Sequence, residues 1–443
     1  SDGAGGSVPN ETFAITVNPI NDAPTQGANG GLTLNEGASA AIGAALLDFN
    51  DVEQGDGAIT YTLDSTTANG TLWLDANGND VLDAGEALTN GESFTQADIN
   101  ANRLRYSHDG SETTIDSFQF DVSDGVGGNF LNATFAITVN PVNDDPPKGD
   151  FNGNGTSDLL WRHDGGTLTT WQMDGASAQA NAFSAFVGTD WKLATVGDFN
   201  GDGRADFAWR HTASGAVTTW QMDGSAASPN AFQAQVAPDW RLTAAGDFDG
   251  DGIDDLLWRN VDSGTLTTWQ MNGTSATPNV FTAHVGTDWH IAGVGDFDGD
   301  GIDDLLWRHD NGALTTWEMN GGSASANAFS AFVGADWNIV GIGDFDGDGI
   351  DDLLWRHDGG TISTWEMDGG SATPNVFSAF VGNDWEVAGI GDFNADGRDD
   401  LMWRHDNGTI TSWEMNGAAV TPNVFQANVG TDWTLFKQEY DLV

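Results

Sequence analysis

The sequence predicts an all-β protein in which a β-sandwich module precedes a six-bladed β-propeller. A motif of Asp-Phe followed by Asn or Asp recurs at spacings of 48 or 49 residues, beginning at Asp150, Asp198, Asp247, Asp296, Asp344 and Asp392. Each of the six units holds four short apolar and β-branched runs between Gly, Asp and Asn, the pattern of a propeller blade. Residues 26–147 contain one of the 19 tryptophans and alternate apolar with polar residues, which is typical of a sandwich.

The composition limits the classes of partner. The chain has 443 residues, enough for two or three domains, and it lacks cysteine, so no disulfide supports them. Its 66 acidic and 14 basic residues give a formal charge of −52. This charge excludes nucleic acid and anionic membrane surfaces, which require clustered Lys and Arg, and favours cations as partners. No apolar run is long enough for membrane insertion, and the first residues lack the features of an export signal.

Residues 1–25 are predicted to be the C-terminal strand of a preceding module. Residues 1–24 match residues 123–146, with SDGAGG opposite SDGVGG and FAITVNPINDAP opposite FAITVNPVNDDP. A segment that repeats the end of the next module is expected to end a module of its own. We therefore expect the sequence to be the C-terminal part of a longer protein with tandem repeats.

Residues 26–147 are predicted to form the sandwich, with strands in AITYTL, RLRYSH, SFQFDV and FAITVN. The flanking segments NDAPT and NDDPP are short, stiff linkers. The segment DANGNDVLDAGE has the ligand spacing of an EF-hand calcium loop at positions 1, 3, 5, 7, 9 and 12, with Gly at position 4 and Asp80 at position 6. It is predicted to bind calcium, the alternative being a solvated acidic hairpin; its ligands are Asp75, Asn77, Asn79, the Val81 carbonyl, Asp83 and Glu86.

Residues 148–443 are predicted to form the propeller. In the second unit, LATVGDF leads into an acidic loop, followed by strands in DFAWRHT and AVTTWQM, a crossing rich in Gly, Ala, Ser, Pro and Asn, and a last strand in AFQAQVA. The first unit is preceded by NDDPPKG, which is too rich in proline for a strand, and the chain ends in DWTLFKQEYDLV, a strand without its loop. We therefore expect the C-terminal strand to complete the first blade and close the ring.

The acidic loop of each unit has the pattern Asp-x-Asn/Asp-x-Asn/Asp-Gly-x-x-Asp, which is typical of a calcium loop. Side-chain oxygens at positions 1, 3, 5 and 9 and a carbonyl at position 7 suit Ca²⁺, and the glycine at position 6 allows a sharp turn. The alternative is a set of Asx turns. Converging carboxylates repel unless a cation lies between them, so we expect a structural calcium in each loop. The predicted ligands are, loop by loop, Asp150, Asn152, Asn154, Thr156 and Asp158; Asp198, Asn200, Asp202, Arg204 and Asp206; Asp247, Asp249, Asp251, Ile253 and Asp255; Asp296, Asp298, Asp300, Ile302 and Asp304; Asp344, Asp346, Asp348, Ile350 and Asp352; and Asp392, Asn394, Asp396, Arg398 and Asp400.

Eighteen tryptophans fall into three series with one member in each unit. At least two series are expected to pack between blades, because so many exposed indoles would promote aggregation. An arginine follows each member of the first series, and five of these arginines precede a histidine. Each arginine is expected to pair with a carboxylate or carbonyls, and the alternative is a sugar site of Trp, Arg and His between blades. The second series is the candidate for ligand binding: Trp171, Trp220, Trp269, Trp317, Trp365 and Trp413.

The motifs GDFNGDGRAD, LLWRHD and TTWQM resemble the FG-GAP or VCBS repeat family in its bacterial form, over residues 150–443. This resemblance implies a calcium-binding propeller like that of integrin α-chains and some fungal lectins. Those members have seven blades and this sequence has six units, so their ligand sites are not transferred.

Residues 26–147 resemble the cadherin-like repeats of bacterial adhesins, which are related to chondroitin sulfate proteoglycan repeats. The resemblance is carried by LNEG, FTQADINANRLRYSHDGSE, SFQFDVSDG and the NDAP-type linker. It implies a further acidic cluster of Glu36, Asp51, Glu53 and Asp124.

Taken together, these features predict a non-catalytic, calcium-stabilised adhesion or structural protein, extracellular or at a bacterial cell surface. Its partners would be calcium, glycans, another surface protein or further copies of itself. Two alternatives are a subunit of a surface filament and a polysaccharide-active enzyme. The enzyme is disfavoured because the sequence has no cysteine nucleophile, no Gly-x-Ser-x-Gly and no His-Glu-x-x-His.

Overall fold

The structure is a computed structural model, which describes residues 12–16, 20–35, 37–109, 115–140 and 147–437. It divides into two compact units, residues 1–140 and 141–443, and each is described by itself. The boundary predicted between residues 147 and 148 lies a few residues after this division. Within the described ranges, no helix is long and apolar enough to cross a membrane.

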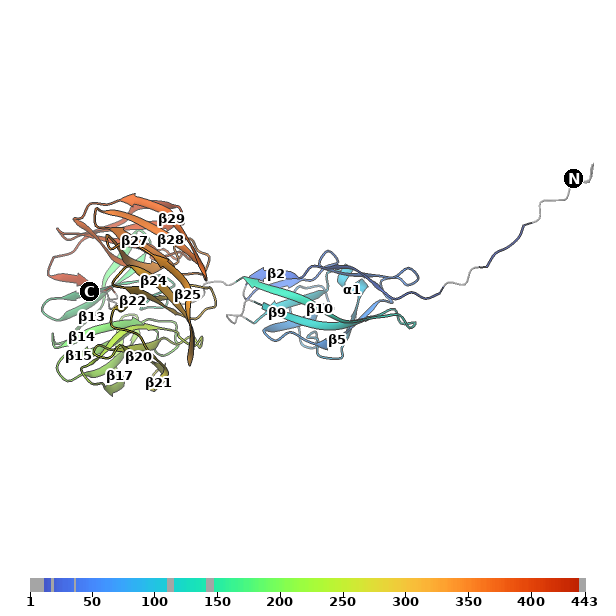
Figure 1. Cartoon of the computed structure of the whole chain (residues 1–443), viewed down its shortest axis with the longest axis horizontal. Helices are drawn as coiled ribbons and strands as arrows, with labels where there is room; N and C mark the ends of the chain where they lie inside the picture. The colour runs from blue at the N-terminus through green and yellow to red at the C-terminus, as the bar shows by residue number, and fades with distance from the viewer. Residues whose placement is uncertain (1–11, 17–19, 36, 110–114, 141–146, 438–443) are drawn as a thin grey trace, which may run out of the picture. The chain divides into compact units, whose positions relative to one another are not determined.

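The described residues of unit 1 form short strands and one short helix (Figure 1). Its elements are β1 (Thr25–Asn29), β2 (Leu32–Asn35), β3 (Ser39–Ala41), β4 (Leu47–Asn50), β5 (Thr60–Ser65), β6 (Gly70–Leu74), β7 (Ser93–Thr95), α1 (Gln96–Asn100), β8 (Leu104–His108), β9 (Ile115–Ser123) and β10 (Asn129–Asn140). They form a five-stranded sheet in the order β2-β10-β9-β5-β7, a three-stranded sheet β3-β8-β6 and the pair β1-β4. The β10–β2 pairing is parallel.

The alternating sequence builds a single core between these sheets. Phe118, Phe120 and Val122 of β9 are buried, while the residues between them face outward. They share a core cluster with Leu104 and Tyr106 of the three-stranded sheet. A period of two places every second side chain on one face, so the predicted sandwich pattern is confirmed.

The helix α1 was not predicted, although its start has a recognisable signal. Thr95 and Asp98 form a capping box, in which the Thr95 side chain accepts from the Asp98 N–H and the Asp98 side chain accepts from the Thr95 N–H. These two bonds satisfy backbone donors that a helix start leaves free, which explains why a helix begins here.

Unit 2 contains six four-stranded sheets in its described residues (Figure 1). The first is β13-β12-β11-β34, with β11 (Leu159–His163), β12 (Thr167–Asp174), β13 (Ser177–Phe186) and β34 (Trp433–Leu435). The others follow chain order: β14 (Trp191–Gly197), β15 (Asp206–His211), β16 (Ala216–Asp223), β17 (Ala226–Gln235); β18 (Trp240–Gly246), β19 (Asp255–Asn260), β20 (Thr265–Asn272), β21 (Ser275–His284); β22 (Trp289–Gly295), β23 (Asp304–His309), β24 (Ala313–Asn320), β25 (Ser323–Phe332); β26 (Trp337–Gly343), β27 (Asp352–His357), β28 (Thr361–Asp368), β29 (Ser371–Phe380); and β30 (Trp385–Gly391), β31 (Asp400–His405), β32 (Thr409–Asn416), β33 (Ala419–Asn428).

The crossing predicted before the last strand of each unit is wrong. In the second sheet this segment is already part of β17, which pairs with β16 from Ala226 onward. Gly224 and Asn230 adopt φ of 61° and 62°, so a tight turn and a bulge replace the expected loop. Pro229 is tolerated because β17 is an outer strand, where a missing N–H leaves no ladder bond broken.

The six sheets form a closed ring. The C-terminal strand β34 pairs with β11, as the loop-free end of the sequence predicts. Buried side chains of one sheet pack on the next: Leu257 of the third shares a cluster with Ile291 of the fourth. The same kind of cluster joins the sixth sheet to the first, through Met402 and Trp161. Because the ring is closed, each of the six sheets packs against a neighbouring sheet on both of its faces.

Candidate metal centres

The acidic loops are numbered here by sheet, loops 1 to 6; loops 2 to 6 join the first and second strands of their sheets, and loop 1 precedes β11. They are residues 150–158, 198–206, 247–255, 296–304, 344–352 and 392–400, with positions 1 to 9 in each. In loop 3, Asp247 Oδ1 accepts from Gly250 N at 2.8 Å and Oδ2 accepts from Gly252 N at 2.7 Å. Both glycines have positive φ, 72° and 74°, so positions 4 and 6 both require left-handed backbone.

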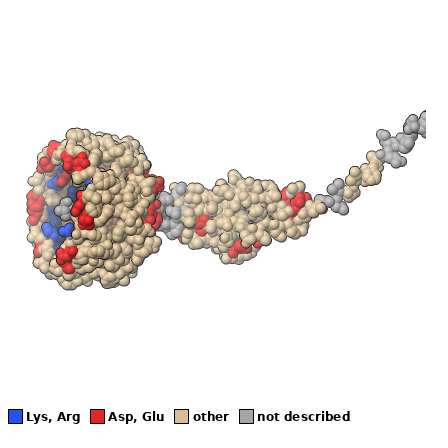
Figure 2. All heavy atoms as spheres, in the orientation of Figure 1, with Lys and Arg blue, Asp and Glu red and all other residues tan. Residues whose placement is uncertain are grey.

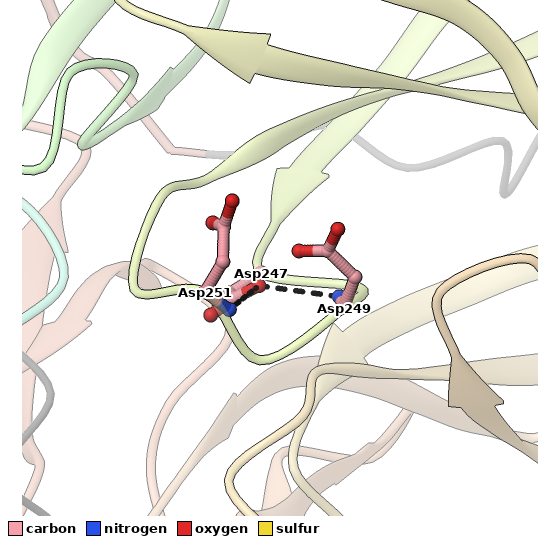
Figure 3. A group of neighbouring side chains, drawn as sticks. All are labelled: Asp247, Asp249 and Asp251. Atoms are coloured by element: carbon pink, nitrogen blue, oxygen red, sulfur yellow. Dashed lines mark hydrogen bonds between the residues drawn. The ribbon is translucent and has the colours of Figure 1, made fainter.

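Three carboxylates converge in each of loops 3, 4 and 5. The oxygens of Asp247, Asp249 and Asp251 lie within 4.8 Å of one another. Figure 3 shows the side chains of Asp249 and Asp251 rising from opposite sides of the loop, with Asp247 between them. The equivalent groups are Asp296, Asp298, Asp300 and Asp344, Asp346, Asp348. Three like charges this close are the arrangement that a divalent cation stabilises.

The carboxylate at position 9 is anchored in the sheet. Asp255 Oδ1 accepts from Met271 N of β20 at 2.8 Å, and Asp255 is 1% exposed. Its second oxygen is buried and has no hydrogen-bond donor, as in Asp304, Asp352 and Asp400. At position 3, Asp249 Oδ1 and Asp298 Oδ1 are buried without a donor too. Buried acceptors without donors are costly, and a hard cation such as Ca²⁺ is the partner that suits them.

Loops 1 and 2 bring positions 3 and 9 together directly. Asn152 Nδ2 donates to Asp158 Oδ2 at 3.0 Å, and Asn200 Nδ2 donates to Asp206 Oδ2 at 2.9 Å. Turning the amide by half a rotation would present its oxygen in place of the nitrogen. The predicted ligands at these two positions are therefore neighbours in the fold.

The carboxyl groups at position 9 have raised pKa values. Burial, opposed by the Met271 N–H and reinforced by the neighbouring loop carboxylates, raises the pKa of Asp255 to about 9. The same causes, with the equivalent backbone donors, raise the pKa of Asp304 and Asp352 to about 9 and that of Asp400 to about 8. A bound cation would offset this cost by stabilising the ionised form.

Asx turns, the alternative considered from the sequence, also occur in these loops. Each position-1 carboxylate accepts several backbone N–H groups of its own loop, as Asp247 does. Position-5 side chains accept in the same way, as Asp251 Oδ1 does from Ile253 N at 3.0 Å. These turns leave one oxygen of Asp249 and one of Asp255 buried without a donor. Asx turns therefore account for the shape of the loop and not for its unpartnered acceptors.

Position 7 has a packing role that the sequence did not reveal. The Ile253 side chain lies over Gly201 of loop 2, where an added Cβ would meet Ile253 Cγ1 at 3.1 Å. Arg204 and Arg398 cover the position-4 glycines of the preceding loops in the same way. Whether the position-7 carbonyls bind a metal stays a prediction.

Sequence reasoning also missed the bonds that join the loops to one another. The position-8 N–H of each loop donates to the position-1 carbonyl of the preceding loop, for example Asp303 N to Asp247 O at 2.7 Å. Ser157 N to Asp392 O at 2.7 Å closes the circle. At the centre, Lys148 Nζ contacts Asp351 Oδ2 at 2.7 Å. The only signal for this role was the first Asp of the repeated Ile-Asp-Asp sequence.

The loop in unit 1 has the predicted convergence. Asn77 Nδ2 and Asn79 Nδ2 both donate to Asp83 Oδ2, at 2.7 and 3.0 Å. Glu86 accepts from Ala76 N and Asp83 N, so the position-12 side chain reaches back across the loop. The first ligand, Asp75, is 2% exposed.

The weaker acidic cluster of unit 1 is only partly described. Glu36 lies outside the described residues. Asp124 is buried and accepts from Asn21 Nδ2 and Val126 N, and Glu53 Oε2 accepts from Asp22 N at 3.4 Å. Asp51 Oδ2 is buried without a donor. The cluster resembles a metal site less closely than the loops of unit 2 do, because most of its oxygens already have backbone donors.

The residues of the alternative sugar site, the first-series Trp with the Arg and His that follow it, have contacts within the ring. The first tryptophan series is buried, with Trp258 1% exposed. Arg210 Cζ lies 5.2 Å from the Trp258 ring of the next sheet, while Arg210 Nη2 donates to Ala237 O at 2.9 Å. His211 Nε2 lies 2.9 Å from Asp190 Oδ2. Arginine therefore faces an indole and a carbonyl, and histidine faces an acid.

The second tryptophan series is partly buried. Each member packs on the first-series indole of its own sheet, with centroids 5.2 Å apart for Trp258 and Trp269. This contact confirms a packing role for the series. Its predicted role in ligand binding stays a prediction.

Comparison with known proteins agrees with this division. A cadherin-like family model matches residues 24–139, and an FG-GAP-like repeat model matches residues 150–209, 247–307 and 296–355. Mouse (Mus musculus) "Extracellular matrix organizing protein FRAS1" is 33% identical over 150 residues, covering 31% of this chain and 4% of that protein. Human "Chondroitin sulfate proteoglycan 4" is 36% identical over 115 residues, covering 26% of this chain. The chain thus spans about 4% of the length of these two relatives.

Two solved structures are also similar. The periplasmic gluconolactonase PpgL of Pseudomonas aeruginosa covers 65% of this chain and 99% of its own, with 14% identity and a TM-score of 0.42. The Cps50 (Swd1) β-propeller domain of Myceliophteria thermophila covers 65% of this chain and 96% of its own, with 10% identity and a TM-score of 0.39. From the family matches and the sheets described above, this chain carries a cadherin-like domain followed by FG-GAP-like repeats.

Proposed function

We propose that this chain is a non-catalytic, extracellular adhesion or structural protein in which calcium ions clip the six loops of the ring. The observation that carries the calcium proposal is the set of buried oxygens without donors at positions 3 and 9, beside three converging carboxylates. The extracellular role is supported by the similarity to the mouse protein FRAS1, whose name describes it as organising the extracellular matrix.

Calcium here would be structural. Loops 2 to 6 each connect two strands of one sheet, and every loop bonds to the loop of the preceding sheet. An ion in a loop would therefore stiffen the ring. Six equivalent sites also argue against catalysis, which needs one asymmetric arrangement of groups. The predicted residues of the unit 1 loop would hold a further ion in the same manner.

The calcium proposal is tested by titration and thermal unfolding. Calcium should raise the unfolding temperature of the whole chain, and a chelator should reverse the increase. Asp304→Asn should remove part of this increase, whereas Asp174→Asn, which changes an exposed carboxylate outside the loops, should leave it unchanged. Equal unfolding temperatures with calcium and with chelator would contradict the proposal.

The adhesion role is tested separately. The chain should bind extracellular matrix polysaccharide or protein immobilised on a surface, more strongly with calcium than with chelator. Electron microscopy distinguishes the filament alternative, in which the purified chain would assemble end to end. Turnover of a polysaccharide that one substitution outside the repeats abolishes would favour the enzyme alternative instead.

A further inference from the structure

A cavity of about 850 Å³ lies inside the ring of unit 2, and its wall is chemically asymmetric. The first strands of the sheets enclose it, and the first strands of successive sheets are neighbours. Its apolar wall includes Ile339, Ile342 and Val387. Its polar groups include Arg241, Asn338, Glu386 and Lys437. This volume is within the range of ligand pockets, roughly 300–1,000 Å³.

Three polar residues of the cavity, Arg241, Asn338 and Glu386, come from a position at which every sheet differs. Each first strand begins with a tryptophan, and the residue after it is opposite an arginine of the second strand, as Arg241 is opposite Arg259. We call this arginine, which follows the buried first-series tryptophan, the ring arginine. The six residues at this position are Lys192, Arg241, His290, Asn338, Glu386 and Thr434. The tryptophan before them and the arginine opposite are the same in all six sheets. The variable position therefore does not serve the packing of the ring. Because its six residues all differ, the side chains at this end of the ring do not follow the six-fold repeat.

Positive charge is concentrated here in an otherwise acidic chain. Lys and Arg make up 14 of the 443 residues, and four of them line the cavity beside three acids. The four are Lys148, Arg241, Arg356 and Lys437, and the acids are Asp158, Asp358 and Glu386. The six ring arginines lie opposite the variable position in the strand register. Figure 2 shows Lys and Arg side chains gathered inside a hollow at one end of unit 2, with Asp and Glu around the rim. Positive charge inside such a hollow strengthens the local electrostatic field and attracts anions, while the acidic rim repels them.

We propose that this cavity binds an acidic saccharide. Arg241 and Lys437 would supply positive charge for a carboxylate or sulfate, and Asn338 and Glu386 would bind hydroxyl groups. Trp385 also lines the cavity and is partly exposed, so it offers an apolar face to a sugar ring. A simple inorganic anion would use the cations alone, whereas the amide, the carboxylate and the indole together suit a hydroxylated ligand.

The proposal goes beyond the adhesion role. Phe151 and Asp158 of loop 1 also line the cavity, but the residues assigned here to the saccharide lie outside the calcium loops. The test is isothermal titration calorimetry of the whole chain, with calcium fixed at the same concentration in cell and syringe. The probes are a trimer of galacturonic acid and a neutral trisaccharide. The acidic trimer should bind at least about 10-fold more tightly than the neutral one, because charge-assisted hydrogen bonds are the stronger kind. Its affinity should fall as salt increases.

Substitutions locate the binding. Arg241→Glu should weaken binding of the acidic trimer by at least about 10-fold, and Asn338→Ala should weaken it while leaving the salt dependence intact. Lys192→Ala is the matched control, because Lys192 has the same register position but does not line the cavity; it should change affinity less than about 2-fold. Each variant is checked for an unchanged calcium-dependent unfolding temperature, so that failure of this proposal is distinct from failure of the calcium proposal. No binding of the acidic trimer, equal binding of both probes, or full affinity in Arg241→Glu would each overturn it.

Discussion

At the scale of single residues, each position of the acidic loop has a separate physical task. Position 1 accepts backbone N–H groups and shapes the loop, as Asp247 does. Position 9 anchors the loop to the sheet through a backbone N–H, as Asp255 does. Position 8 joins one loop to the preceding one, as Asp303 does. The sequence predicted only which oxygens of the loop could bind calcium. The structure adds the hydrogen bonds that positions 1, 8 and 9 make with the backbone.

Loop 6 contains a strained residue that can be relieved. Position 4 is Ala395, with φ of 59°, whereas the other five loops have glycine there. A left-handed alanine costs about 1 kcal/mol relative to glycine, so Ala395→Gly should stabilise the protein by up to about that amount. Gly347→Ala in loop 5 is the reverse change and should destabilise, because Arg398 Cγ also lies 3.2 Å from the added Cβ. Urea unfolding measures both, and destabilisation by Ala395→Gly would contradict the strain argument.

The calcium-free protein should lose stability as the pH rises from about 5 to about 9. The pKa of Asp255, Asp304 and Asp352 is raised to about 9 in the folded state, against about 4 in an unfolded chain. The folded state therefore holds protons that the unfolded state has released. This contribution to stability is complete below the unfolded pKa and is lost as the pH rises through the folded pKa.

Thermal unfolding in chelator at several pH values measures this effect. Asp255→Asn should reduce the pH dependence, because one of the titrating groups is gone. Saturating calcium should weaken it as well, since the ion takes the place of the proton. An unfolding temperature that rises with pH in chelator between 5 and 9 would show that burial is not the dominant cause.

At the scale of elements, the loops differ in charge although they share a shape. Loops 3, 4 and 5 have Asp at positions 1, 3, 5 and 9, while loop 1 has Asp150, Asn152, Asn154 and Asp158. Affinity for calcium rises with the number of charged ligands when the geometry is otherwise similar. Loop 1 should therefore lose calcium first on chelation and loops 3 to 5 last. Calcium titration of Asn154→Asp, which should strengthen loop 1, and of Asp348→Asn, which should weaken loop 5, tests this order; equal affinities would refute it.

The arginine after each buried tryptophan joins one sheet to the next. Arg308 Cζ lies 5.2 Å from the Trp355 ring, and Arg308 Nη2 donates to Gly334 O at 3.1 Å. Arg308→Ala should destabilise the protein by about 2 kcal/mol, from the lost cation–π contact and carbonyl bond. Arg308→Lys keeps the charge but not the planar group, and it should recover less than half of this loss. Urea unfolding is the measurement, and a lysine variant as stable as the original would indicate that charge alone matters.

At the scale of the whole molecule, closure of the ring depends on the last strand of the chain. The strand β34 pairs with β11, and Phe436 N donates to Leu160 O at 2.7 Å. Through Leu435 this strand also contributes to the cluster between the sixth and first sheets. The ring is thus closed by residues that lie at the two ends of unit 2.

Removal of residues 433–443 should open the ring. The first sheet would lose its fourth strand, so β11 would present an unpaired edge that invites pairing between molecules. We expect a lower unfolding temperature and concentration-dependent self-association, measured by calorimetry and by light scattering. Removal of residues 438–443 alone is the control and should leave β34 in place. A monomeric, equally stable protein after the longer truncation would contradict the role of β34.

Much of this fold can be predicted from the sequence because its signals are local and repeated. The period of 48 or 49 residues, the strand runs and the acidic loops each depend on neighbours in the chain, and six copies make weak patterns decisive. The prediction of a crossing before the last strand was wrong for a local reason too. The bulge in β17 depends on the left-handed conformation of Asn230, and a sequence rich in Gly, Ser and Pro is equally typical of a loop.

The sequence by itself determined the six repeats, the sandwich pattern and the residues that could bind calcium, because chain spacing sets which side chains share a loop or a strand face. The tertiary structure alone decided that the arginines face the indoles of the next sheet and that each loop bonds to its neighbour. It also decided that three residues of one variable position line the cavity of the ring. These contacts join residues about 50 positions apart or more. Such contacts follow from closure of the ring, which no local spacing describes.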